Sequence, residues 1–184
     1  MNMRYLSFLL LFLFFTAKAQ LPAQHCGYDF TSYLVLNVHE NGKKENIKNL
    51  KITIADESGK EIINVNNIYS WTNSNKPLVF SSNYKIDENG NRVTEEVKDQ
   101  KTRWFFPFAK DNYLLSVANT FPADNFFIKV EDTDGEANGG RFKTQSLQLN
   151  SFNMYVLCSA QNERQAQQFG PRTNRPVEII LERE

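Results

Sequence analysis

The stretch YLVLNVH at residues 33–39 decides the fold class of this chain. Apolar residues alternate within it, so that Leu34, Leu36 and Val38 share one face of an extended strand. The stretch LKITI at residues 50–54 repeats the alternation. Successive side chains of a strand point to opposite faces, and such a pattern therefore predicts a strand with one buried face. Two strands of this kind, joined by a short connection, predict β structure.

The rest of the chain continues with short strands and turn signals. Further strands are predicted at residues 126–130, 142–149, 152–158 and 177–182. Asn-Gly at 41–42 and Asp-Glu-Ser-Gly at 56–59 are typical of chain reversals. Only residues 162–169 carry a helical pattern, and that segment also fits a loop. Seven or more short strands without alternating helices predict an all-β protein, a single antiparallel β-sandwich of the prealbumin-like or immunoglobulin-like type.

Residues 64–103 depart from this regular pattern. They are polar and rich in asparagine, and Asn89-Gly90 is predicted to form a tight type I′ turn in a protruding hairpin. Aromatic residues stand on both sides of the hairpin. The candidate binding surface that they suggest consists of Tyr69, Trp71 and Trp104, of which Trp104 opens the aromatic run WFFPF. The alternative is that these rings belong to the core where the chain re-enters the sheet.

The overall composition fits one globular domain. The chain has 184 residues, 21 basic and 21 acidic side chains, and 41% hydrophobic residues. Balanced charge leaves no basic field for nucleic acid or for a membrane surface, so neither is expected as a partner. With two histidines and two cysteines, neither clustered, metal chemistry is not expected either.

The first nineteen residues read as an export signal. Arg4 supplies a positive start, residues 6–15 are almost entirely apolar, and Ala17-Lys18-Ala19 forms a cleavage site before Gln20. The apolar run is too short to span a bilayer. We therefore expect a mature domain over residues 20–184, periplasmic or extracellular, with no transmembrane segment after cleavage.

Export changes the interpretation of the two cysteines. Cys26 and Cys158 are an even pair in an oxidising compartment, which is most simply one disulfide. Lipidation of Cys26 would require a small residue directly before it, where this chain has His25. A catalytic thiol is less favoured, because its only imidazole partners would be His25 and His39.

Three segments together resemble the carboxypeptidase regulatory-like or transthyretin-like family. They are residues 33–38, residues 47–59 and the aromatic-turn-strand segment 104–117. The resemblance implies a seven-stranded sandwich with an accessory role, which supports a neighbouring domain, binds a partner or displays a surface. Asn49 stands where the family usually has Pro or Gly. The enzymatic branch, which hydrolyses hydroxyisourate, ends in Tyr-Arg-Gly-Ser, whereas this chain ends LERE. The composition also resembles that of exported proteins from Bacteroidetes-type bacteria.

One loop offers ligands for a hard cation. Four oxygen-bearing side chains follow one another at alternate positions, as Ca²⁺ would require; they are Asp132, Asp134, Glu136 and Asn138. The loop is not an EF-hand, because Arg141 falls where the bidentate glutamate should stand. A solvated turn between strands is the other interpretation.

The predicted function is an exported, non-catalytic β-sandwich module for binding or protein–protein interaction, with a protein or other envelope partner. No nucleophile elbow, phosphate loop, dinucleotide fingerprint or zinc-protease motif occurs in the sequence. The alternative is an exported hydrolase or Ca²⁺-dependent enzyme with a carboxylate pair that the sequence does not locate.

Overall fold

The computed structural model describes residues 31–94, 100–118, 121–150, 154–157 and 176–184. The predicted leader 1–19, both cysteines and the helical segment 162–169 lie outside the described residues. The export signal, the disulfide and that segment therefore stay predictions.

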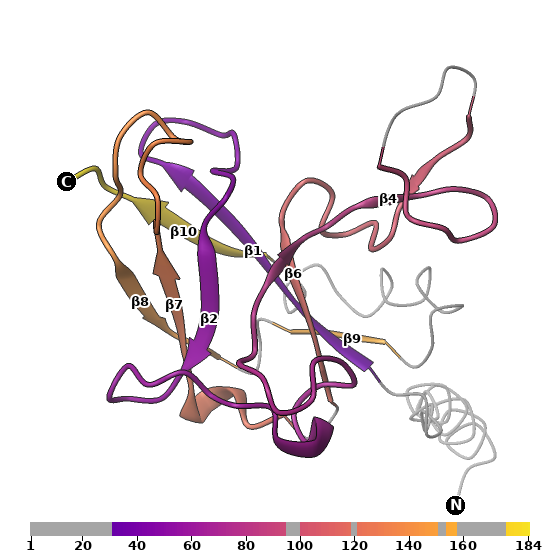
Figure 1. Ribbon diagram of the computed structural model, residues 1–184, viewed down its shortest axis with the longest axis horizontal. Coiled ribbons are helices and arrows are strands. Elements are labelled where there is room, and N and C mark those ends of the chain that lie inside the picture. The colour runs from indigo at the N-terminus through magenta and orange to yellow at the C-terminus, as the bar shows by residue number, and fades with distance from the viewer. Residues whose placement is uncertain (1–30, 95–99, 119–120, 151–153, 158–175) are drawn as a thin grey trace, which may run out of the picture.

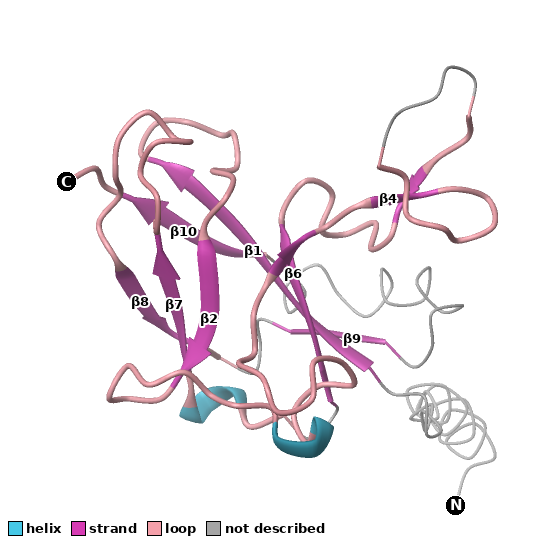
Figure 2. Ribbon diagram, in the orientation of Figure 1, coloured by secondary structure: helices cyan, strands magenta, loops and turns pink. Residues whose placement is uncertain are grey.

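The described residues form ten strands and two single-turn 3₁₀ helices, which confirms the all-β class (Figure 2). The elements are β1 (Thr31–Glu40), β2 (Lys51–Ala55), η1 (Val65–Asn67), β3 (Ser81–Ser82), β4 (Lys85–Ile86), β5 (Arg103–Trp104), β6 (Tyr113–Ala118), η2 (Ala123–Asn125), β7 (Phe127–Glu131), β8 (Gln145–Gln148), β9 (Met154–Leu157) and β10 (Val177–Leu181).

The larger sheet is built around β1 and has the order β10-β1-β6-β3, with β9 also paired to β1. The first half of β1 pairs antiparallel with β9, and its second half pairs with β10 from Leu36↔Val177 to Glu40↔Leu181. The β1–β10 pair is parallel. The expectation of a wholly antiparallel arrangement was therefore wrong here, because alternation marks the buried face of a strand and carries no information on the direction of its neighbour.

The smaller sheet has the order β2-β7-β8, and the chain crosses from it to the larger sheet. Residues 78–80 bond to β2, since the amide of Ile54 donates to the carbonyl of Leu78 over 3.0 Å. The next two residues form β3 and pair with β6 in the larger sheet. Figure 1 shows this crossing segment bridging the two sheets. Leu78 and Phe80 are buried on the way, at 2% and 4% exposure.

The main hydrophobic core lies between the two sheets and takes side chains from both. The inward face predicted for β1 is confirmed, because Leu34, Leu36 and Val38 are fully buried. The alternation of residues 177–182 is confirmed as well, with every second residue of β10 buried. The strand residues that fill this core are Leu34, Leu36, Val38, Ile52, Ile54, Tyr113, Leu115, Val117, Ile128, Val130, Val177, Ile179 and Leu181.

A second, smaller core covers the opposite face of the larger sheet. Val35 of β1 is fully buried, although strict alternation assigns it to the outer face. It packs with Phe106, Ala109 and Leu114. Tyr33 stacks on Phe106 with the ring centroids 4.4 Å apart. The aromatic run after β5 therefore folds back onto the sheet, which supports the core interpretation for its central residue.

Two hairpin loops share one construction, Asp-Glu-x-Gly. In each loop the aspartate carboxylate accepts two backbone amides, and for Asp87 these come from Asn89 and Asn91. Gly90 has a φ of +86°, whereas Asn89 is not among the residues with positive φ. The predicted type I′ turn is therefore wrong, since that turn needs positive φ at both positions. The loop has three residues, with Gly90 in the left-handed position.

Candidate functional site

The three predicted surface aromatics do not form one surface. Tyr69 is half-buried against the main core, with its ring edge-to-face to Phe121 and Phe126 at 6.2 and 5.7 Å. Trp71 is 54% exposed and follows η1, whereas Trp104 lies on β5, in a different part of the molecule (Figure 1). Of the three, only Trp71 presents an open aromatic surface.

Other large apolar side chains are exposed in the same stretch of the chain as Trp71. Six large hydrophobic residues are exposed within the described part of the chain, and five of them come from residues 63–79. We call these five the apolar loop surface: Ile63, Val65, Ile68, Trp71 and Val79. Ile68 has the largest exposed fraction, 59%. Sequence reasoning missed four of the five, because isolated aliphatic residues in a polar segment carry no pattern that distinguishes surface from core.

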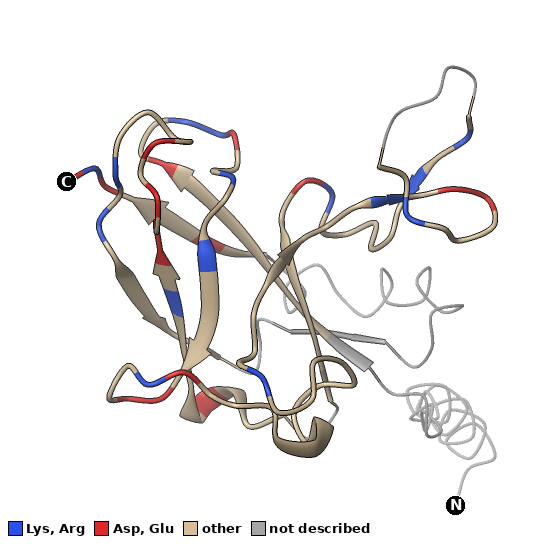
Figure 3. Ribbon diagram, viewed as in Figure 1, with Lys and Arg blue, Asp and Glu red and all other residues tan. Residues whose placement is uncertain are grey.

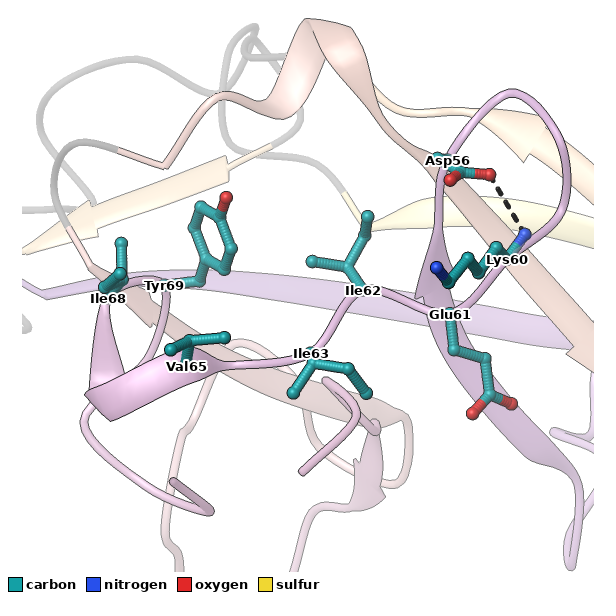
Figure 4. A pocket seen from close by; sticks show the side chains of 8 residues that line it. All are labelled: Asp56, Lys60, Glu61, Ile62, Ile63, Val65, Ile68 and Tyr69. Atoms are coloured by element: carbon teal, nitrogen blue, oxygen red, sulfur yellow. Dashed lines mark hydrogen bonds between the residues drawn. The ribbon is translucent and has the colours of Figure 1, made fainter. Parts of the chain in front are cut away.

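A shallow hollow of about 300 Å³ lies next to this surface. Ile62, Ile68 and Tyr69 point to the same side and form its apolar end, as Figure 4 shows. Asp56 and Lys60 lie at the opposite, polar end. The hollow therefore joins an apolar wall to a charged rim.

One buried asparagine holds the loop that carries the surface. Asn64 is fully buried, and its side-chain oxygen accepts the backbone amides of Tyr69 and Ser70 at 3.0 and 3.1 Å. Its side-chain nitrogen donates to the carbonyls of Ser70 and Thr72 at 2.9 and 2.6 Å. A single amide thus replaces the hydrogen bonds that a β ladder would supply to this irregular segment.

The asparagine-rich composition has a second local cause. Four asparagines of this loop have positive φ, between 49° and 60°. Asparagine tolerates the left-handed conformation better than other residues with a side chain, because its short amide bonds locally. They are Asn66, Asn67, Asn73 and Asn75. The polar composition of the segment therefore follows in part from its backbone geometry.

Only part of the predicted 64–103 excursion projects from the molecule. Residues 78–83 run along the two sheets, and Leu78, Phe80 and Asn83 among them are buried. The side-chain nitrogen of Asn83 donates to the carbonyls of Phe106 and Lys110 at 2.9 and 2.8 Å. The β4–β5 hairpin projects beyond it (Figure 1). Its rings and cations contact one another: Tyr84 stacks on Phe105 at 4.9 Å, and the amine of Lys85 lies 5.7 Å from the ring of Trp104.

The candidate Ca²⁺ loop uses its leading carboxylate on its own backbone. Asp132 is buried, and its two oxygens accept the amides of Gly135 and Phe142 at 3.0 and 3.2 Å. Asp134 caps the next turn by accepting the amide of Ala137 at 3.4 Å. The described residues hold no group of three or more histidine, cysteine or acidic side chains placed to bind a metal. The Ca²⁺ site stays an untested prediction.

A guanidinium ties this loop to β1. Arg183 donates to both oxygens of Glu40 at 3.0 and 3.1 Å and to the carbonyls of Asn138 and Gly140 at 3.1 Å each. Its charge also lies 4.5 Å from the ring of Phe142. Arg183, followed by Lys43, lowers the pKa of Glu40 to about 2. This clamp fixes the C-terminal residues against the loop.

Other ionic groups are paired as well. His39 is 7% exposed, and its Nε2 lies 2.9 Å from an oxygen of Glu178. Its pKa is raised, first by the backbone carbonyl of Glu40 and then by Glu178. On the smaller sheet Lys51 pairs with Glu61. Charges of both signs are spread over several loops and strands without one dominant field (Figure 3).

Comparison of the chain with protein family models, curated proteins and solved structures finds no match. None of the described segments is a helix of the length and apolarity needed to cross a membrane. The resemblance to transthyretin-like domains stays a prediction from sequence.

Proposed function

We propose that this chain is an exported, non-catalytic β-sandwich module that binds a protein partner through the apolar loop surface. The observation that carries the proposal is that residues 63–79 hold five of the six large exposed hydrophobic residues found in the described part of the chain. Scattered apolar residues are normal on a protein surface, whereas a contiguous exposed apolar patch is typical of an interaction site. Three of the five residues, Ile63, Val65 and Ile68, line the same hollow. Tryptophan is among the residues that contribute most binding energy at interfaces.

The anchoring of the loop supports this function. Asn64 makes hydrogen bonds along the segment, and Tyr69 attaches it to the core. A loop that is already ordered loses little conformational entropy when a partner binds. Exposed side chains on such a loop are therefore better suited to binding than the same residues on an unsupported one.

The sandwich part of the proposal rests on the shared core. Side chains from both sheets pack in one cluster, which is the arrangement of a two-layer β protein. Export rests on the leader of the sequence, and the disulfide between Cys26 and Cys158 is expected because of export. Intact mass of the secreted protein tests both, with a start at Gln20 and a mass 2 Da below the reduced form as the expected result. A retained leader or two free thiols would contradict this part.

The binding surface is tested with variants of the exported protein. Cross-linked capture from an extract of the native host is compared for the wild type, Ile68→Ser and Trp71→Ala, with Ile180→Ser as the matched control. Ile180 is 44% exposed but lies on β10, outside the surface. We expect at least about a tenfold loss of affinity for the captured partner in the first two variants only, since burial of one such side chain contributes about 1.5–3 kcal/mol. Equal capture by all four proteins would refute the assignment.

A further inference from the structure

Asn-Gly pairs occur in three loops of the chain, at residues 41–42, 89–90 and 138–139. An asparagine that precedes glycine loses its side-chain amide without an enzyme when the backbone nitrogen of the glycine attacks its side-chain carbonyl carbon. Glycine hinders this approach least, because it has no Cβ. An attacking nitrogen that is held in a hydrogen bond must first leave that bond, so the folded structure determines which pair reacts.

Two of the pairs hold the glycine amide in a closed turn. The amide of Gly90 donates to the carbonyl of Asp87 at 3.1 Å. The amide of Gly139 donates to the carbonyl of Glu136, also at 3.1 Å. In both loops the glycine is the fourth residue of its turn, which is the residue whose amide closes a β-turn. Attack by either nitrogen therefore requires the turn to open.

Further contacts hold the two asparagines of these pairs. The carboxylate of Asp87 accepts the amide of Asn89 at 2.9 Å and that of Asn91 at 2.8 Å. The carbonyl of Asn138 accepts two hydrogen bonds from Arg183, at 3.1 and 3.2 Å, and the side-chain nitrogen of Asn138 is buried. Opening either turn would disturb these contacts as well.

The pair at 41–42 has a different place in its turn, which follows the end of β1 (Figure 1). The amide of Lys43 closes this turn by donating to the carbonyl of Glu40 at 3.0 Å. Gly42 is therefore the third residue, and its φ of +78° is that of the third residue in a type II turn. Asn41 and Gly42 are both exposed. Among the residues that the structure describes, none accepts a hydrogen bond from the amide of Gly42.

The peptide group between Asn41 and Gly42 can rotate while the turn stays closed. Turns of type I and type II differ by a rotation of this central peptide and share the bond between the first and fourth residues. The nitrogen of Gly42 can therefore approach the side chain of Asn41 without the loss of a backbone hydrogen bond. The same dipeptide is thus reactive in one turn and protected in the other two.

We propose that Asn41 is a site of spontaneous deamidation in the folded protein, whereas Asn89 and Asn138 are protected. The nitrogen of Gly42 bonds to Cγ of Asn41, and the side-chain nitrogen leaves as ammonia together with the proton of the Gly42 amide. Water then adds to either carbonyl carbon of the resulting five-membered imide and opens it to aspartate or isoaspartate. One water is consumed for each ammonia released, and nothing is oxidised or reduced.

The product changes the charge at the end of β1. The carboxylate of Glu40 already bonds to Arg183 and to Lys43. Deamidation places a second carboxylate beside these two cations, and isoaspartate also adds one backbone carbon between Glu40 and Lys43. The modification therefore acts on one end of the clamp that Arg183 forms.

The test compares the three pairs within one sample. The purified protein is incubated at mildly alkaline pH, both folded and unfolded in guanidinium chloride, and each site is followed by peptide mass spectrometry with enzymatic methylation of isoaspartate. In the unfolded chain the three pairs should react at similar rates, since glycine follows each asparagine. In the folded protein Asn41 should stay within about threefold of its unfolded rate, while Asn89 and Asn138 should react at least about tenfold more slowly than in the unfolded chain.

Two matched variants assign the reaction to its site. Glutamine has one more side-chain carbon and closes the corresponding ring far more slowly. Asn41→Gln should therefore remove most of the ammonia released by the folded protein, and Asn89→Gln should leave this release almost unchanged. Reaction of Asn89 or Asn138 as fast as Asn41 in the folded wild type would overturn the proposal, and so would about tenfold protection of Asn41. The wild-type comparison decides the matter even if a variant fails to fold.

Discussion

Replacement of Asn64 by alanine should destabilise the protein far more than replacement of any exposed asparagine. Asn64 is fully buried, and its side chain makes hydrogen bonds to Tyr69, Ser70 and Thr72. Alanine removes the donor and the acceptor at once and adds no new polar group. The amide and the carbonyl of Ser70, which is 1% exposed, would both lose their partner.

The magnitude follows from the number of buried groups left without partners. A buried donor or acceptor without a partner costs about 1–3 kcal/mol. Three groups lose their partner, namely the buried amide and carbonyl of Ser70 and the half-buried amide of Tyr69, while the exposed Thr72 can bond water. We therefore expect a loss of about 3 kcal/mol. At a urea dependence of about 2 kcal/mol per molar, the unfolding midpoint should fall by about 1.5 M.

The assay is equilibrium urea unfolding, followed by circular dichroism and by tryptophan fluorescence. The matched control is Asn125→Ala, an exposed asparagine in η2, which should stay within about 0.5 kcal/mol of the wild type. If Asn64→Ala unfolds at the wild-type midpoint with an unchanged slope, Asn64 does not hold the loop, and the argument for a rigid binding surface fails with it.

Three more predictions concern the second core and the charged groups. Phe106→Ala should lower the free energy of unfolding by about 3–5 kcal/mol, because Phe106 is 1% exposed and fills the second core. Urea unfolding measures this loss. A loss under about 1 kcal/mol would show that the aromatic run is not tightly packed against the sheet. The pKa of Glu40 is lowered to about 2, so the stabilising contribution of its carboxylate is present above about pH 4.5 and is lost as the pH falls towards 2. Between these pH values the free energy of unfolding of Glu40→Gln should therefore fall less than that of the wild type. An equal fall in both proteins would contradict the Arg183 clamp. The pKa of His39 is raised, so the contribution of its protonated ring to the free energy of unfolding is present below about pH 6.5 and is lost as the pH rises through the folded-state pKa. The wild type should therefore exceed His39→Gln in stability by more at about pH 5.5 than at about pH 8.5. A larger difference at the higher pH would refute the direction of the pKa shift.

The inward faces of the strands were predictable from sequence because a period of two is a local property. Leu34, Leu36 and Val38 are buried as the pattern predicts. The burial of Val35 was not predictable, since it depends on Phe106, which folds over the sheet from a distant part of the chain. Alternation identifies a face to be covered, and nothing in it states whether a remote segment covers the other face too.

The candidate site was predicted less well, because aromatic residues attract attention and aliphatic ones do not. Trp71 is exposed as the sequence suggested, while Tyr69 supports the core. Ile63, Val65 and Ile68 complete the surface, and their exposure follows from the path of an irregular loop. A strand pattern predicts which residues point outward, but a loop has no such repeat.

Two buried asparagines explain how irregular segments remain fixed in this all-β protein. Asn64 bonds to the backbone of residues 69–72, and Asn83 bonds to the carbonyls of Phe106 and Lys110. Each side-chain amide satisfies polar groups that no strand ladder reaches, and a buried polar group with all its partners rigidifies its surroundings. The exposed apolar residues of the 63–79 loop are therefore held outward by bonds made inside the protein. The polar composition and the exposed apolar side chains are two consequences of the same arrangement, since the asparagines fix the backbone of the loop from which those side chains project.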